Sequence, residues 1–136
     1  MNTTVSIDGK RYSIDYDDEY VDYLLDRLGM ANGHCLKYVK KCVLYFATGT
    51  RRLRAVYDVI ADEYGRGLST IVTHIRVGLE RASIDGRLAR VNDLFMGAVY
   101  DYSYGMTNKE FISVVSSYLK MSGKIDVCLV DGDYFG

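Results

Sequence analysis

The chain has 136 residues, of which 49% are hydrophobic, and its 17 basic and 18 acidic side chains give a net charge of −1. This composition excludes a disordered chain, and the length suits one domain with a buried core. A net charge near zero also excludes a protein that is basic throughout. The positive charge is instead concentrated, because residues 34–90 hold eleven basic and five acidic side chains, whereas residues 1–33 and 91–136 are both net acidic. Any phosphate-bearing partner is therefore expected to bind the middle of the chain.

Three cysteines, at positions 35, 42 and 128, are an odd number and follow no secretory signal. We therefore expect reduced thiols in a cytoplasmic protein. No apolar run has the length of a membrane span, so no membrane is expected as a partner. Cys35 and Cys42 lack the close ligand spacing of zinc sites, and we expect no metal and no cofactor.

Residues 1–16 are predicted to form a β-hairpin. Two short alternating runs, 4–7 and 11–14, flank Asp8 and Gly9, a pair that favours a type I′ turn. A lone hairpin is marginally stable in water, so it needs a further strand. Residues 124–130 alternate with Ile125, Val127 and Leu129 on one side, and we expect this tail (124–136) to join the hairpin in a small sheet.

Residues 17–122 are predicted to be mainly helical. A first helix opens at Asp17 and ends at Gly29, and a second runs from about His34 to Phe46 with three lysines (Lys37, Lys40 and Lys41) on its outer side. A short helix is expected around residues 91–95, before a tyrosine-rich and glycine-rich loop at 96–105. Thr107 and Glu110 then form a capping box that opens the last helix, which ends near Gly123.

The stretch 53–86 reads as two amphipathic helices joined by a glycine turn. The first helix carries one apolar stripe and stops at Gly65-Arg66-Gly67, where glycine supplies the left-handed conformation of a helix end; the stripe is Leu53, Val56, Tyr57, Ile60, Ala61 and Tyr64. Ser69 is the expected N-cap of the second helix. That helix has one apolar stripe and an opposite polar face; the stripe is Ile71, Ile75, Leu79 and Ala82, and the face is Thr70, Thr73, Arg76, Val77, Glu80 and Arg81.

This layout is that of a helix-turn-helix, although two packed amphipathic helices with no binding role give the same periodicity. Taken together, the patterns predict a mainly α single domain over residues 1–136. It is a six-helix bundle containing a helix-turn-helix, with a small β-hairpin or sheet made by the two terminal segments.

The region from about residue 20 to residue 121 resembles a known family. The resemblance lies in Leu28-Gly29 with His34 and Leu36-Lys37-Tyr38, in VYDVIA at 56–61 through Ile75-Arg76 and Leu79-Glu80, and in DLF at 93–95 with TNKEFI at 107–112. These stretches are similar to the C-terminal DNA-binding effector domain of the sporulation master response regulators, the stage 0 sporulation protein A family. The resemblance implies a six-helix bundle around a helix-turn-helix, double-stranded DNA as partner, and a homodimer arranged head to tail.

The resemblance also implies roles for individual residues. Arg76 matches an arginine with which the family reads bases, whereas Val72 and Thr73 stand where the family has a glutamate and another arginine. The hairpin stands where the family's receiver domain would be, so control by receiver phosphorylation is not expected. We expect a sequence-specific transcriptional regulator that binds the major groove through the helix at 69–84. Its expected groove contacts are Thr70, Thr73, Arg76 and Glu80, and its expected phosphate contacts are Arg51, Arg52, Arg54, Arg66, Arg81 and Arg87.

Two other classes of function have some support in the sequence. A protein-interaction module, pairing with a sporulation regulator or with itself, would fit the low polarity of Val72 and Val77 and could use the loop at 100–104. An enzyme is not expected, because His34 and Cys35 are helix neighbours that point in different directions. We interpret Cys35 and Cys42 as buried structural thiols, His74 as a residue at the core edge, and 131–133 (Asp-Gly-Asp) as a turn rather than a calcium loop.

Overall fold

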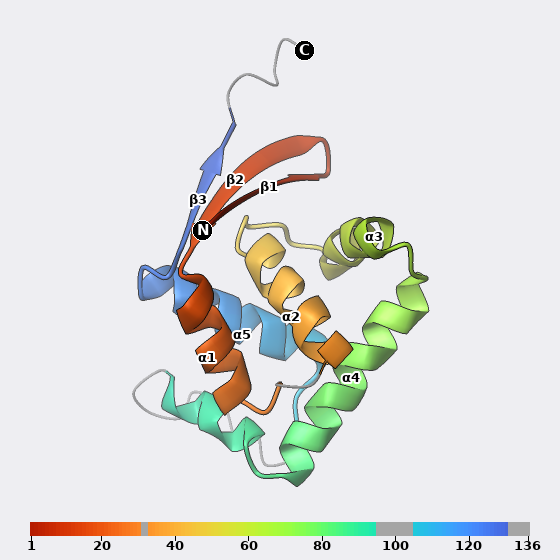
Figure 1. The fold of residues 1–136 in the computed structure, drawn as a ribbon, viewed down its shortest axis with the longest axis vertical. Coiled ribbons are helices and arrows are strands. Elements are labelled where there is room, and N and C mark those ends of the chain that lie inside the picture. Colours follow the sequence, from red (N-terminus) through yellow and green to blue (C-terminus); the bar gives the residue numbers. More distant parts are fainter. Residues whose placement is uncertain (31–32, 95–104, 131–136) are drawn as a thin grey trace.

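The computed structural model describes residues 1–30, 33–94 and 105–130. Within them, helices form the body of the molecule and a three-stranded antiparallel sheet covers one end (Figure 1). The elements in chain order are β1 (Asn2–Ile7), β2 (Lys10–Tyr16), α1 (Asp18–Arg27), α2 (Gly33–Phe46), α3 (Leu53–Tyr64), α4 (Leu68–Ile84), the 3-10 helix η1 (Leu88–Asp93), α5 (Asn108–Met121) and β3 (Ile125–Leu129).

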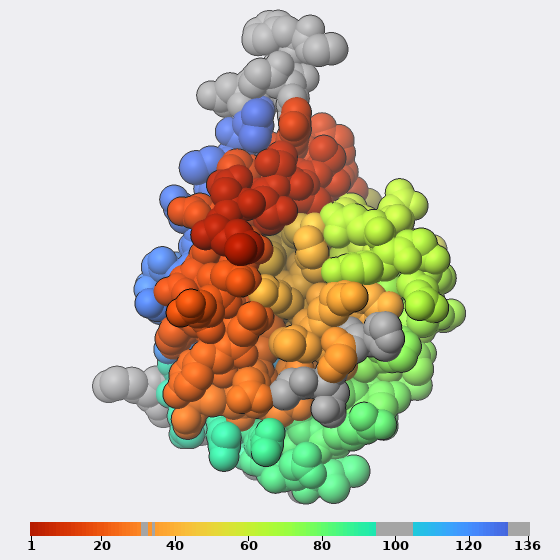
Figure 2. All heavy atoms as spheres, viewed as in Figure 1, coloured from red at the N-terminus to blue at the C-terminus, as the bar shows by residue number. Residues whose placement is uncertain are grey.

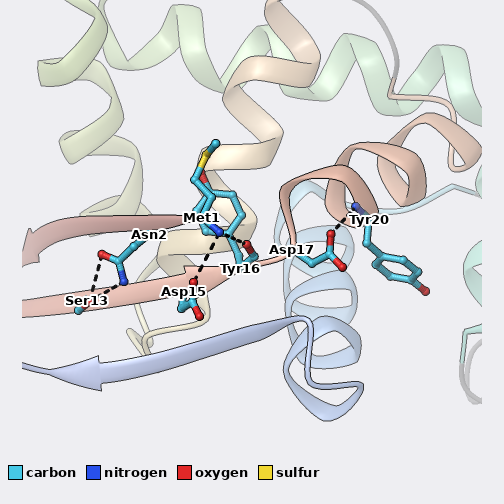
Figure 3. Close-up of polar contacts among 7 residues, drawn as sticks. All are labelled: Met1, Asn2, Ser13, Asp15, Tyr16, Asp17 and Tyr20. Carbon is cyan, nitrogen blue, oxygen red and sulfur yellow. Dashed lines mark hydrogen bonds and ion pairs between the residues drawn. The ribbon is translucent and has the colours of Figure 1, made fainter.

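The sheet confirms the hairpin and the added tail strand. Asp8 and Gly9 have φ values of 52° and 77°, the two positive values that a type I′ turn requires. The strand order is β1-β2-β3, and both pairings are antiparallel. The N-terminal amine donates a 2.8 Å hydrogen bond to the carbonyl of Tyr16, and Asp17 caps α1 by accepting from the amide of Tyr20 (Figure 3). These bonds fix the sheet and α1 where the chain passes from the end of β2 into the helix.

Helix α2 is the centre of the core. It contacts α1, α3, α4 and α5, and its residues Val39, Cys42 and Val43 have no exposed surface. The helix is also tied to α1 by charge, because the Lys40 ammonium pairs with the carboxylates of Asp18 and Asp22. The expectation that Lys40 lies on an outer face is therefore wrong. Its side chain is only 21% exposed, since α1 covers it with two acidic partners.

One local prediction, the N-cap of α4, also differs from the structure. Helix α4 begins at Leu68 with Gly67 as its N-cap, so Ser69 lies inside the first turn and does not cap it. The N-cap therefore lies two residues earlier than expected, and Leu68, the first residue of the helix, packs against the core. The short helix expected after Gly86 is present as the 3-10 helix η1, in which Leu88 and Val91 are buried; Phe95 falls outside the described residues.

Candidate nucleic-acid interface

A tight turn fixes the direction of α4 relative to α3. Gly65 ends α3 in the left-handed conformation (φ 60°), and the amide of Arg66 donates to the carbonyl of Ala61 at 3.0 Å. A residue with a Cβ would be strained there, so glycine makes this sharp change of direction easy. Helices α3 and α4 contact each other, and both contact α2. In the space-filling view their side chains make one flank of the molecule (Figure 2).

Helix α4 has one buried and one exposed face, as its helical spacing predicted. Ile71, Ile75 and Ala82 have no exposed surface, and Leu79 is 2% exposed. The opposite side is open to solvent at four of the proposed contact residues, Thr73, Arg76, Glu80 and Arg81, and half-buried at Thr70 and Val77. Seventeen helical residues span about 25 Å at 1.5 Å each, so this face is long enough to lie in a groove of DNA.

Close backbone contacts hold the inner face of α4. A Cβ built on Gly78 would lie 2.1 Å from the Cys35 sulfur, so only glycine lets α4 approach the start of α2 this closely. A Cβ on Gly29, whose φ is 92°, would lie 2.7 Å from the Cβ of Ala82. The start of α2 and the residues before it therefore pack closely on α4 at two glycines, Gly78 of α4 and Gly29 after α1. Sequence reasoning missed Gly78, because nothing in the local pattern marks a helix–helix contact.

Helix α5 supplies a polar link to α3 and α4. The amide nitrogen Nδ2 of Asn108 donates to the Val72 carbonyl and to the Tyr57 hydroxyl, both at 3.2 Å. Asn108 is the first residue of α5, and the predicted capping box, with Thr107 as N-cap and Glu110 closing it, is present. The start of α5 is therefore fixed against the first half of α4.

The six arginines proposed as phosphate contacts are all exposed, and they cluster at helix ends. Arg51, Arg52 and Arg54 surround the start of α3, Arg66 lies in the turn before α4, and the last two, Arg81 and Arg87, lie at or beyond the end of α4. The guanidinium of Arg52 is 3.6 Å from the carboxylate of Asp8, with both side chains more than half exposed, so solvent screens this pair.

The first turns of α3 and α4 contain no acidic residue, whereas those of α1 and α5 do. Helix N-termini carry partial positive charge, and acidic side chains there normally neutralise it. Residues 66–79 contain no carboxylate at all. Further along, the Arg76 guanidinium lies 4.0 Å from the Glu80 carboxylate, and both side chains are exposed. The start of α4 is therefore the most electropositive part of the helix.

Two of the three cysteines, Cys35 and Cys42, are buried. Burial raises the pKa of the Cys35 thiol from 9.0 to about 11, and it raises the pKa of the fully buried Cys42 thiol further. Both are therefore neutral thiols at pH 7, as expected of structural residues. The ring of His74 lies 5.7 Å from that of Tyr38 at the edge of the core. Over the described ranges, no three His, Cys, Asp or Glu side chains gather as a metal site would require.

Several expectations fall outside the described residues. These are the contact loop at 100–104, the turn at 131–133, and the side chain of His34. Among the described helices, none combines the length and the apolar character needed to cross a membrane. Comparison with protein-family models, with curated proteins and with solved structures found no significant match to the chain.

Proposed function

We propose that this protein is a sequence-specific DNA-binding transcriptional regulator. In this proposal α3 and α4 form a helix-turn-helix within a six-helix bundle, and α4 lies in the major groove as the recognition helix. The observation that carries the proposal is the exposed face of α4, which continues into two helix starts without acidic residues and flanked by arginines. The likeness of residues 20–121 to the sporulation regulator effector domains supports the same function, with a homodimer on DNA.

The residues divide into two roles. Arg76 is the proposed base-reading side chain, because it is exposed in the middle of α4 and carries donors that match guanine. Thr70, Thr73 and Glu80 share its groove-facing surface. The arginines at the helix ends contact phosphates, which fix the position of the protein without reading sequence. Val72 and Thr73 replace two charged side chains of the family's reading set, so the preferred site is expected to differ from the family's.

The experiment is selection of binding sites from random DNA duplexes at low salt, followed by affinity measurements on the enriched sequence and on a scrambled one. We expect Arg76→Ala to weaken binding to the enriched sequence by about 1–3 kcal/mol and to change little on the scrambled one. Arg52→Ala is expected to weaken binding to both equally. Lys120→Ala is a charge-matched control, because Lys120 is exposed in the last turn of α5, at the opposite end of that helix from the Asn108 contact with α4.

Salt dependence gives a second readout of the same proposal. Six phosphate contacts per protomer would give a log–log slope of about −5, and Arg52→Ala should reduce its magnitude by about 1. Equal losses from Arg76→Ala and Arg52→Ala on every duplex would contradict base reading by Arg76. A folded protein that binds no duplex at low salt would contradict DNA binding altogether.

That last outcome would favour the second candidate function, a protein-interaction module. The observation that supports it is the apolar part of the same surface. Ile84 is 85% exposed at the end of α4. A hollow of about 390 Å³ also lies beside the exposed face, lined by Thr73, Val77 and Arg81 among others. A protein partner would place an apolar side chain in that hollow, whereas DNA would leave it unfilled.

A further inference from the structure

The outer edge of β3 offers backbone hydrogen-bonding groups to a partner. The order β1-β2-β3 leaves β3 at a margin of the sheet, on the side away from α3 and α4 (Figure 1). Asp17 donates to the Lys124 carbonyl, and Val130 donates to the Arg11 carbonyl. Because antiparallel pairs alternate, the even-numbered residues of β3 bond β2, and the odd-numbered ones turn their amides and carbonyls outward. Within residues 1–30, 33–94 and 105–130, no other strand pairs with the outward groups of Ile125, Val127 and Leu129.

This edge lacks the features that normally prevent strand pairing. Residues 125–129 contain no proline and no lysine, and Asp126 is their one charged side chain. Leu129 is 42% exposed although it lies on the inner side of the sheet, and Cys128 is exposed on the outer side. The other edge strand, β1, instead contacts α3, and its outward positions carry small polar residues. The margin at β3 is therefore the better template for another strand.

We propose that a second copy of this chain pairs with β3, antiparallel about a two-fold axis through Val127, so that two sheets join into one. In this register the outward groups of Ile125 face those of Leu129 of the partner subunit. Val127 faces its own copy. The pairing gives about six backbone hydrogen bonds. On the inner side of the sheet, it also places Ile125 of each subunit beside Leu129 of the other and the two Val127 side chains beside each other. The half-exposed Leu129 is thereby covered.

Charge selects this register among its neighbours. With the axis at Val127, Asp126 stands opposite Cys128 of the partner subunit, so no like charges meet. A shift that places the axis at Asp126 would bring the two Asp126 carboxylates directly opposite each other, which is destabilising. A shift that places the axis at Cys128 pairs fewer residues of the strand. The sequence of β3 is therefore self-complementary in one register.

This two-fold contact differs from the head-to-tail arrangement that the family resemblance implies on DNA. It uses no residue of α3 or α4, so it can hold or fail whether or not the protein binds DNA. A five-residue strand pair is smaller than a standard stable interface, and the dimer is expected to be weak and concentration-dependent.

The test is sedimentation velocity of the purified full chain in reducing buffer, without DNA, from micromolar to millimolar concentration. We expect a reversible monomer–dimer equilibrium. Val127→Pro removes an outward amide but no hydrogen bond within the monomer, and it should abolish the dimer. Thr4→Pro is the matched control, because the Thr4 amide points outward from the other edge strand; it should leave the equilibrium unchanged. Circular dichroism checks that both variants are folded.

A pair of charge variants tests the register without relying on proline. In the dimer, residue 128 of each subunit lies opposite Asp126 of the other subunit. Cys128→Asp would therefore create two pairs of like charges, and Cys128→Lys would create two pairs of opposite charges. We expect the dissociation constant to rise about five-fold in the first and to fall about five-fold in the second. A chain that stays monomeric at millimolar concentration overturns the proposal. So does a dimer whose strength is unchanged by Val127→Pro or is equal in the two Cys128 variants.

Discussion

Replacing Gly78 by alanine tests whether α4 is held as closely as the structure indicates. On helix propensity alone, alanine should stabilise the protein by about 1 kcal/mol. The new methyl group, however, would lie 2.1 Å from the Cys35 sulfur, which is itself backed by the Met30 sulfur at 3.7 Å. Overpacking of this kind costs about 1–3 kcal/mol, and the buried sulfur places the cost at the upper end. We expect a net loss of about 2 kcal/mol.

Thermal and urea unfolding followed by circular dichroism measure this loss. For a chain of this size, 2 kcal/mol corresponds to a melting temperature lower by about 8 °C. Cys35→Ala removes the obstructing sulfur, so the double variant should be more stable than Gly78→Ala by about 1 kcal/mol, a clear departure from additivity. Thr73→Ala, on the exposed face of α4, should stay within about 0.5 kcal/mol of the parent. If Gly78→Ala proves stabilising, as propensity alone predicts, the close approach of α4 to α2 is wrong.

Three further outcomes follow from the same structure. In the native protein at pH 7 a thiol reagent should modify one cysteine, the exposed Cys128, and in denaturant all three, because Cys35 and Cys42 are buried. Burial raises the pKa of Cys35 to about 11 and that of Tyr57 to about 12, so the unfolded chain loses these protons at lower pH than the folded chain. The free energy of unfolding should therefore fall as the pH rises above about 9. An unfolding free energy that is the same at pH 9 and pH 11 would contradict this. Thr107→Ala removes the capping box of α5 and should lower the free energy of unfolding in urea by about 1 kcal/mol. Ser69→Ala is the control and should lower it by less, because Ser69 is exposed and does not cap α4.

Features governed by neighbouring residues in the chain were predictable from sequence. Asp8 and Gly9 define the hairpin turn because only a few residue types adopt positive φ readily. Gly65 ends α3 for the same reason, and Thr107 with Glu110 opens α5 through a cap contained in four residues. Apolar spacing likewise identified both faces of α4.

Features that depend on contacts between distant segments were not predictable. The glycine at position 78 looks like a weak point in a helix until the Cys35 sulfur is found against it. Lys40 looks like a solvated residue until α1 folds over it with two carboxylates. The N-cap of α4 is Gly67 rather than Ser69, and the residue between them, Leu68, packs against the core, a contact that the local sequence does not reveal. For the candidate site, spacing gave the exposed side chains but not the pairing of Arg52 with Asp8.

The close packing behind α4 also bears on the proposed function. Base reading requires a recognition helix whose position is fixed to within a fraction of an ångström, and Gly78, Gly29 and Asn108 each hold α4 from its inner side. Gly78→Ala changes none of the side chains proposed to contact DNA, but it pushes the middle of the helix outward. We therefore expect binding to the selected sequence to weaken about ten-fold, while binding to scrambled DNA, which depends on phosphates, changes little. Titration of the folded variant at a temperature well below its unfolding transition measures both affinities. If the two affinities fall together, the loss reflects unfolding or lost charge rather than a displaced reading helix.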